Sequence, residues 1–291
     1  MPELPEVETV RIGLAKLLPG RTIKQVEFDN PKSFPNSPED VASFVVGAKV
    51  LLVARRAKVL LIELSSKYSL VIHLKMTGQL VFRGEHNFGA GHPNDSLIGK
   101  LPDKTTHVTI SFEDGTKLFF NDQRKFGWVR VFPTAEVPNI DFFQKVGPEP
   151  LDSSFTPDIF YERLQRRKNS NIKAVLLDQT VLAGIGNIYA DEALWDAKIH
   201  PATSVKDITK AQSDILYKGL IDVLRLSIEK GGSTDRNYVN AEGKKGSYIS
   251  FARVFRREGK PCPRCDTTIE KIRVAGRGTH FCPYCQRLST R

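Results

Sequence analysis

This chain of 291 residues has few cysteines and no long apolar run, and both scarcities restrict what it can be. There are only four cysteines, and all of them lie between residues 262 and 285. No apolar run approaches the roughly 20 residues that a membrane span needs, and no basic-then-apolar signal segment opens the chain. We therefore expect a cytoplasmic protein, or one from a comparable reducing compartment, with no membrane-spanning segment.

Acidic residues are too few to balance the basic ones, since the formal net charge is +10. The excess is concentrated at the end of the chain, where residues 252–291 contain ten Lys and Arg but only three Asp and Glu. A solvated basic tail is one explanation. A polyanionic partner is the other, with nucleic acid the first candidate and an acidic membrane surface the second.

Many short strand-like runs fill the first half of the chain. They are predicted at residues 50–54, 59–64, 69–74, 79–82, 106–112, 117–121 and 128–132. The Asp114-Gly115 pair between two alternating runs is a strong hairpin signal. Runs at this spacing predict a sandwich or flattened barrel. Residues 83–104 are rich in Gly, His, Asn and Pro, and we predict a mobile surface loop there.

The second half of the chain has a helical pattern. Five prolines between residues 133 and 157 predict a linker, and helices are expected at 158–167, 172–179, 187–197 and 207–230. The predicted organisation is a β-sandwich domain at residues 1–133, a linker at 134–157, a helical domain at 158–250 and a four-cysteine segment at 251–291.

The cysteines form two C-x2-C pairs separated by sixteen residues, Cys262 with Cys265 and Cys282 with Cys285. This spacing is typical of a four-thiolate zinc site, whereas disulfides are disfavoured in a reducing compartment. Four thiolates leave no coordination position for water, so the predicted Zn²⁺ is structural and folds a small hairpin.

The sequence Met1-Pro2-Glu3-Leu4-Pro5-Glu6 has two interpretations. It can simply begin a helix, with Pro5 in the first turn and acidic residues complementing the helix dipole. Alternatively, removal of Met1 leaves Pro2 as an N-terminal secondary amine, which titrates at roughly 7.7–8 and is therefore partly nucleophilic at neutral pH. These residues alone favour the first interpretation.

Taken together, the segments resemble a known family. A Pro-Glu-Leu-Pro-Glu start, a β-rich first half, a helical second half containing Gly184-Ile-Gly-Asn-Ile-Tyr-Ala-Asp-Glu192 and a terminal four-cysteine hairpin resemble formamidopyrimidine-DNA glycosylase. The likeness extends over essentially the whole chain. It implies an α+β fold, with an N-terminal β-sandwich domain and flanking helices followed by a helical domain with a helix–two-turns–helix element and a zinc-ribbon hairpin.

The resemblance also implies a chemistry. The expected enzyme is a bifunctional DNA glycosylase and AP lyase that removes oxidised purines, chiefly 8-oxoguanine and formamidopyrimidines, in base excision repair. The family's nucleophile falls on Pro2 and its acid on Glu3, while Glu6 supports the site. Lys58 matches the family's phosphate-binding lysine, although a basic run between strands is usually a solvated hairpin.

Further matched residues are expected to bind damaged double-stranded DNA in a basic groove between the domains. An extruded base leaves a gap in the duplex, and the family's gap-filling residues fall on Met76, Arg124 and Phe126. Composition alone would instead place Met76 and Phe126 in the core, but Gly78 and Gly127 beside them indicate loop tips. The remaining matches are to phosphate ligands, at Asn187 and Arg277.

Some positions depart from the family pattern. Gln123 stands where a proline or aliphatic residue is usual, and Asn169 interrupts a basic run, so no lysine contact is carried over there. Residues 233–250 match a variable lesion-capping loop, and no base-reading residue is assigned within it.

We expect a monomer associated with the bacterial nucleoid.

Two other functions remain open. An enzyme like endonuclease VIII would prefer oxidised pyrimidines, but its usual start has Gly where this chain has Leu4. A zinc-hairpin protein that senses damaged DNA without catalysis would keep the fold and lack the activity.

Overall fold

The computed structural model describes residues 2–92, 94–233 and 248–288. These residues belong to two units. The first unit comprises Met1–Gln144 with Lys230–Ser247, and the second comprises Lys145–Glu229 with Tyr248–Arg291. The domain limits predicted from sequence, at residues 133, 157 and 250, stay a prediction.

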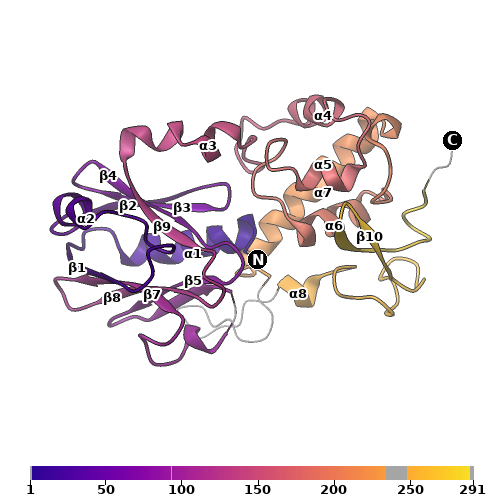
Figure 1. Cartoon of the computed structure of the whole chain (residues 1–291). Helices are drawn as coiled ribbons and strands as arrows, with labels where there is room; N and C mark the ends of the chain where they lie inside the picture. Colours follow the sequence, from indigo (N-terminus) through magenta and orange to yellow (C-terminus); the bar gives the residue numbers. More distant parts are fainter. Residues whose placement is uncertain (1, 93, 234–247, 289–291) are drawn as a thin grey trace. The chain divides into compact units, whose positions relative to one another are not determined.

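The first unit contains two antiparallel sheets, visible as two layers in Figure 1. One sheet has the order β1-β7-β8-β5-β6 and the other the order β2-β3-β4-β9. The strands are β1 (Ile23–Phe28), β2 (Val50–Arg56), β3 (Val59–Leu64), β4 (Tyr68–His73), β5 (Gly78–Arg83), β6 (Phe88–Gly91), β7 (Thr106–Phe112), β8 (Lys117–Asp122) and β9 (Trp128–Pro133). Apolar residues from both sheets share one buried core, so the predicted β-sandwich is confirmed.

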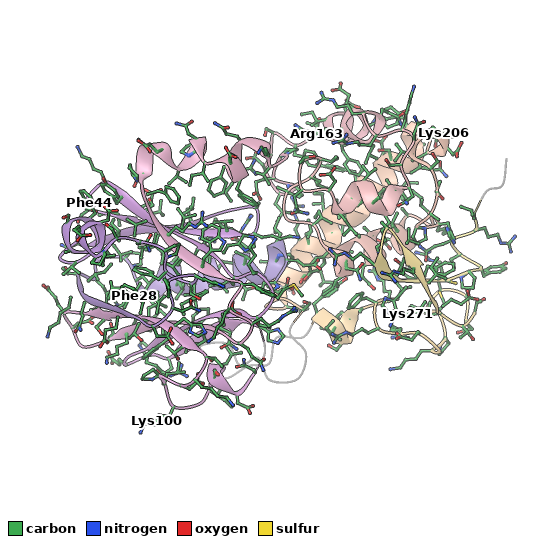
Figure 2. The ribbon with its side chains drawn as sticks, viewed as in Figure 1. Phe28, Phe44, Lys100, Arg163, Lys206 and Lys271 are labelled. Atoms are coloured by element: carbon green, nitrogen blue, oxygen red, sulfur yellow. The ribbon has the colours of Figure 1, made fainter. Side chains whose placement is uncertain are left out.

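Short-range hydrogen bonds hold the predicted β7–β8 turn and the start of one helix. Asp114 accepts hydrogen bonds from the backbone N–H and the hydroxyl of Thr116, at 3.0 and 2.6 Å, and so closes the β7–β8 hairpin. Helix α2 (Pro38–Phe44) begins after Ser37, whose hydroxyl accepts from the Asp40 N–H at 3.0 Å. Its last residue, Phe44 (Figure 2), stacks on Tyr68 of β4 with ring centroids 3.8 Å apart.

The prediction of a surface loop at residues 83–104 is wrong for its central part. Residues 88–91 form the edge strand β6, and Asp95–Leu97 form the short helix η1. The physical reason is burial, because Phe88 is only 4% exposed. Its ring packs where a side chain on Gly13 would otherwise stand, since a Cβ there would meet the Phe88 ring. Glycine in helix α1 (Leu4–Leu17) thus makes room for the edge strand.

The segment after β9 lies over the outer face of the four-stranded sheet (Figure 1). It contains η2 (Thr134–Asn139) and α3 (Asp141–Lys145). Phe142 and Phe143 pack with Val137 against the buried Val59 and Val71 of the sheet. Residues 134–144 are therefore packed against the sheet and belong to the first unit.

The second unit has a helical core and a small hairpin. Its helices are α4 (Pro157–Gln165), α5 (Ile172–Leu177), α6 (Asn187–Asp196), η3 (Val205–Asp207), α7 (Lys210–Glu229) and α8 (Tyr248–Phe251). The hairpin consists of β10 (Glu270–Val274) and β11 (Arg277–Phe281). The four longer helices lie within a few residues of their predicted bounds. Among the described residues, no helix combines the length and the apolar character needed to cross a membrane.

Candidate functional site

The start of the chain is buried in the first unit. Pro2 and Glu3 precede α1, and Glu3 is only 4% exposed. The Glu6 carboxylate, one turn into the helix, accepts from the Glu3 N–H at 2.8 Å. Its other oxygen accepts from the N–H of Ser233 at 2.7 Å. Glu6 therefore fixes the residue next to Pro2 and joins it to a segment 227 positions further along the chain.

That segment needs glycine. Gly232 has φ +89°, which L side chains rarely adopt, and a Cβ there would stand 3.3 Å from Cγ of Glu6. Gly231 has a positive φ of 77°. The two glycines let the backbone pass close enough for Ser233 to reach the carboxylate.

Lys58 lies in the tight turn between β2 and β3. Ala57, the residue before it, has φ +53°. Arg55 donates to the Ala57 carbonyl at 2.8 Å and, through Nε, to Glu8 of α1 at 2.8 Å. The turn that carries Lys58 is thereby tied to the helix that Pro2 precedes. Glu8 lies about 7.5 Å along the helix axis from Glu3, at 1.5 Å per residue.

A buried histidine lies close to Lys58. His73 faces Val59 across the β3–β4 ladder and is 7% exposed. Burial, with the charges of Lys75 and Lys58, lowers the pKa of His73 from 6.5 to about 3. Its Nδ1 accepts from the Lys75 N–H at 3.0 Å, so the ring is neutral with its proton on Nε2. His73 is therefore a neutral imidazole beside two lysines.

The predicted gap-filling residues lie on the surface of the same unit. Met76 is 36% exposed and Phe126 is 53% exposed, which excludes a core position for either. Arg124 is exposed and stacks over the Phe126 ring, 4.8 Å from its centroid. All three follow or precede strands at one end of the five-stranded sheet, where Gly78 of β5 pairs with Asp122 of β8.

In the second unit, Asn187 and Arg277 are brought close together. Asn187 is the first residue of α6, and its side-chain amide donates to the Gly278 carbonyl of β11 at 2.9 Å. Arg277 is the exposed first residue of β11, directly after the turn at Ala275 and Gly276. Both turn residues have positive φ, as a two-residue hairpin turn requires. The positive end of the α6 dipole lies at this terminus and adds to the preference for an anion here.

A buried ion pair, which sequence reasoning missed, holds this arrangement. Lys173 of α5 and Asp191 of α6 are both 0% exposed and form a direct ion pair. Lys173 also donates to the Thr279 hydroxyl at 2.8 Å. The other Asp191 oxygen accepts from the backbone N–H of His280 at 2.9 Å. Asp191 is one helical turn after Asn187, so it fixes β11 to the same face of α6.

The network continues to the surface. Nε2 of His280 lies 3.2 Å from the Glu258 carboxylate. Glu258 in turn pairs with Lys271 at 3.1 Å (Lys271 is labelled in Figure 2). The sequence alone indicates only part of this network. Asn187 and Asp191 are four residues apart on a predicted helix, but their partners are about 90 positions away.

Glu192, the next residue of α6, is a second buried carboxylate. It accepts from the consecutive N–H groups of Arg253, Val254 and Phe255 at 2.8, 2.9 and 2.8 Å. Burial raises the pKa of Glu192, and these three donors oppose that rise. Glu192 therefore anchors the chain where it enters the four-cysteine segment.

The four cysteines have the geometry of one tetrahedral metal site. The sulfur atoms of Cys262, Cys265, Cys282 and Cys285 all lie within 4.8 Å of one another. Zinc–sulfur bonds of about 2.3 Å place tetrahedral ligands about 3.8 Å apart. The Cys265 sulfur lies 3.5 Å from that of Cys282 and 3.4 Å from that of Cys285, so a small adjustment admits the ion.

Groups around the sulfurs compensate the charge of thiolates. The indole Nε1–H of Trp195 in α6 points to the Cys262 sulfur at 3.4 Å, and the Cys285 N–H points to the Cys282 sulfur at 3.4 Å. The donor set and its surroundings fit one structural Zn²⁺. When bound, the ion would hold the two C-x2-C segments together and supply no open coordination position.

Family models match most of the chain. The model described as "Formamidopyrimidine-DNA glycosylase N-terminal domain" matches residues 1–129, and the "Formamidopyrimidine-DNA glycosylase H2TH domain" matches residues 146–238. A third, "Zinc finger found in FPG and IleRS", matches residues 259–288.

Full-length relatives agree with these models. A formamidopyrimidine-DNA glycosylase of Chloroflexus aurantiacus is 44% identical over 98% of each chain. One of Desulforamulus reducens is 41% identical over 99% of each chain. A solved structure of the Lactococcus lactis protein, in complex with DNA containing an abasic site, has a TM-score of 0.86 at 35% identity. It covers 98% of this chain and 99% of that one.

A further Lactococcus lactis structure, of a mutant in complex with DNA containing Fapy-dG, also has a TM-score of 0.86 at 35% identity. It covers 98% of this chain and all of that one. The matches to these relatives and structures extend over essentially the whole length of the chain. The chain belongs to the formamidopyrimidine-DNA glycosylase family.

Proposed function

We propose that this chain excises 8-oxoguanine and formamidopyrimidines from double-stranded DNA, using Pro2 as the nucleophile. As a member of its family, the chain is a DNA glycosylase with AP lyase activity in base excision repair. The observation that carries the assignment of residues is the buried Pro2-Glu3 pair, held by the Glu6 carboxylate through the Glu3 N–H.

The mechanism begins once the Met1–Pro2 peptide bond has been cleaved, because only then is the Pro2 nitrogen an amine. That secondary amine attacks the sugar C1′, and the damaged base leaves with the electron pair of the glycosidic bond. The N–H proton that the amine loses on forming the C–N bond balances the negative charge of the departing base. Glu3 donates a proton to the ring oxygen of the sugar, which opens the ring and yields an iminium ion on Pro2. The iminium is cationic because the proline nitrogen carries no hydrogen to lose.

Strand cleavage follows from this intermediate. The iminium withdraws electrons, so a proton at C2′ becomes acidic, and its removal expels the 3′ phosphate by β-elimination. A second elimination expels the 5′ phosphate. Lys58 would bind the phosphate at the lesion from its turn, which Arg55 ties to Glu8 of α1.

The other matched residues would bind the rest of the damaged duplex. Met76, Arg124 and Phe126 would fill the gap that the extruded base leaves, and Arg124 would hydrogen-bond the orphaned partner base. Asn187 and Arg277 would bind phosphates from the second unit. We further propose that the enzyme acts as a monomer in the bacterial cytoplasm, at the nucleoid.

Borohydride trapping tests the central step. With an abasic duplex, the wild-type protein should give a reduced covalent adduct, and N-terminal mass analysis should show that Met1 is absent. Pro2→Gly should lose the adduct. Glu3→Gln should reduce excision roughly 100-fold or more, the usual loss for a general acid. Glu39→Gln, which alters an exposed first-turn carboxylate of α2, is the matched control.

Two outcomes would contradict the proposal. An absence of adduct in the wild-type protein would favour a non-catalytic sensor of damaged DNA. Faster release of thymine glycol than of 8-oxoguanine paired with C would instead favour an enzyme like endonuclease VIII.

A further inference from the structure

Asp122, the last residue of β8, is a buried carboxylate that no step of the proposed mechanism uses. It is 0% exposed, although it directly precedes the exposed loop that carries Arg124 and Phe126. Its register partner in β5 is Gly78, which follows Met76 and Thr77. The antiparallel pairing therefore brings the Met76 turn and the Arg124–Phe126 loop to the same end of the sheet.

The Asp122 side chain joins these two loops. One carboxylate oxygen accepts from the Thr77 hydroxyl and, at 3.2 Å, from the Arg124 N–H. The other oxygen accepts from the Gly127 N–H at 2.6 Å. The Arg124 N–H also donates to the Thr77 hydroxyl oxygen at 3.0 Å. Hydrogen bonds to a carboxylate are roughly twice as strong as those between neutral groups.

The backbone around these contacts leaves little room for an alternative arrangement. Lys75 and Lys125, one in each loop, have positive φ of 51° and 56°. A Cβ on Gly127 would stand 2.8 Å from the Phe120 ring and 3.1 Å from the Asp122 carboxylate. Asp122 itself is held from behind, because its carbonyl oxygen accepts from Nε2 of the buried His107 at 3.0 Å.

The result is a buried base of Thr77, Asp122 and Gly127 beneath three exposed side chains. Met76 projects from one loop, and Arg124 stacks on Phe126 in the other. The backbone that carries these three side chains is thus hydrogen-bonded to one carboxylate and one hydroxyl.

We propose that Asp122 is a positioning residue which, through Thr77, locks the Met76 turn and the Arg124–Phe126 loop into one rigid element that enters the duplex as a unit. This inference rests on the proposed function, since it concerns how the gap beside an extruded nucleotide is filled. The DNA concerned is a duplex, because only a duplex has a partner strand and leaves a gap when a base is extruded.

That distinction provides the test. Asp122→Asn and Thr77→Val should slow single-turnover excision of 8-oxoguanine from a duplex by roughly 10- to 100-fold, as expected for misplaced contact groups. Borohydride trapping on a single-stranded abasic oligonucleotide should stay within about twofold of wild type, because no gap is filled there. A 2-aminopurine opposite the lesion should show a correspondingly slower fluorescence rise.

Two controls accompany these variants. Thr77→Ser keeps the hydroxyl and should restore duplex excision to near the wild-type rate. Asp114→Asn alters another turn-closing carboxylate of the same sheet, before the start of β8, and should have no effect. If Asp122→Asn does not fold, as judged by thermal unfolding, the comparison of Thr77→Val with Thr77→Ser carries the same test.

Wild-type excision rates in Asp122→Asn and Thr77→Val would overturn the proposal. So would equal losses on the duplex and on the single strand, which would place Asp122 in support of the reaction centre. A wild-type protein that forms no adduct with either DNA would refute the proposed function instead, so the two failures are distinguishable.

Discussion

Replacing Asp191 with alanine should destabilise the second unit severely. The change leaves the ammonium group of Lys173 at 0% exposure without its carboxylate, and it removes the acceptor of the His280 N–H. Breaking a buried ion pair by removing one partner costs about 3–5 kcal/mol. At roughly 2–4 °C per kcal/mol for a protein of this size, the unfolding midpoint should fall by about 6–20 °C.

Thermal unfolding followed by circular dichroism measures this shift. The matched control is Asp222→Ala on α7, because Asp222 also pairs with a lysine, Lys218, but at the surface. The control should leave the midpoint unchanged within error, since exposed pairs contribute little. Combining Lys173→Met with Asp191→Asn should recover part of the loss, because no buried charge is then left unpaired.

The same variant also has a functional consequence. Asp191 fixes β11 to the face of α6 that bears Asn187, so DNA affinity should fall together with stability. A midpoint for Asp191→Ala no lower than that of Asp222→Ala would refute the reasoning. It would mean that the Lys173–Asp191 pair does not hold the hairpin.

Three more predictions concern pH, metal and salt. The pKa of His73 is about 3 in the folded chain against 6.5 otherwise, so the unfolding free energy should decrease as pH falls from about 6.5 towards 3. In His73→Gln, the slope of the unfolding free energy against pH, measured by urea unfolding, should be smaller by up to about 1.4 kcal/mol per pH unit. A slope equal to that of the wild type would contradict this. Native mass spectrometry should find one Zn²⁺ per chain in the wild type and none in Cys285→Ala. Residues 259–288 of that variant should become sensitive to proteases. Full protection without the metal would count against a structural ion. Arg277→Ala should reduce the slope of log K against log salt by about 1, and an unaltered slope would show that Arg277 contacts no phosphate.

Local sequence signals predicted most of the strands, the four longer helices and the metal site. The Asp114-Gly115 turn and the C-x2-C spacing each depend on residues a few positions apart. Strand β6 was missed because its reason lies elsewhere in the chain, in the space that Gly13 leaves for Phe88.

The supporting residues of the site were missed for the same reason. Asp122 reaches Thr77 across 45 positions, and Asp191 reaches His280 across 89. A lone aspartate at a strand end or on a helix looks like any surface acid in sequence. Only the folded register shows that each of them is buried and shared between two functional segments.

The hydrogen bond from Ser233 to Glu6 has a consequence for synthesis on the ribosome. The chain begins with the helix that carries Glu6, but the partner of that carboxylate is added 227 residues later. Residues 230–233 belong to the first unit although the whole helical segment to Glu229 is made before them. The first unit therefore cannot form all its contacts until residue 233 has been synthesised. A fragment ending at residue 144 would lack the hydrogen bond from Ser233 to Glu6. Glu6 is therefore synthesised long before its partner, and a product truncated before residue 233 lacks the hydrogen bond that holds Glu6 beside Pro2 and Glu3.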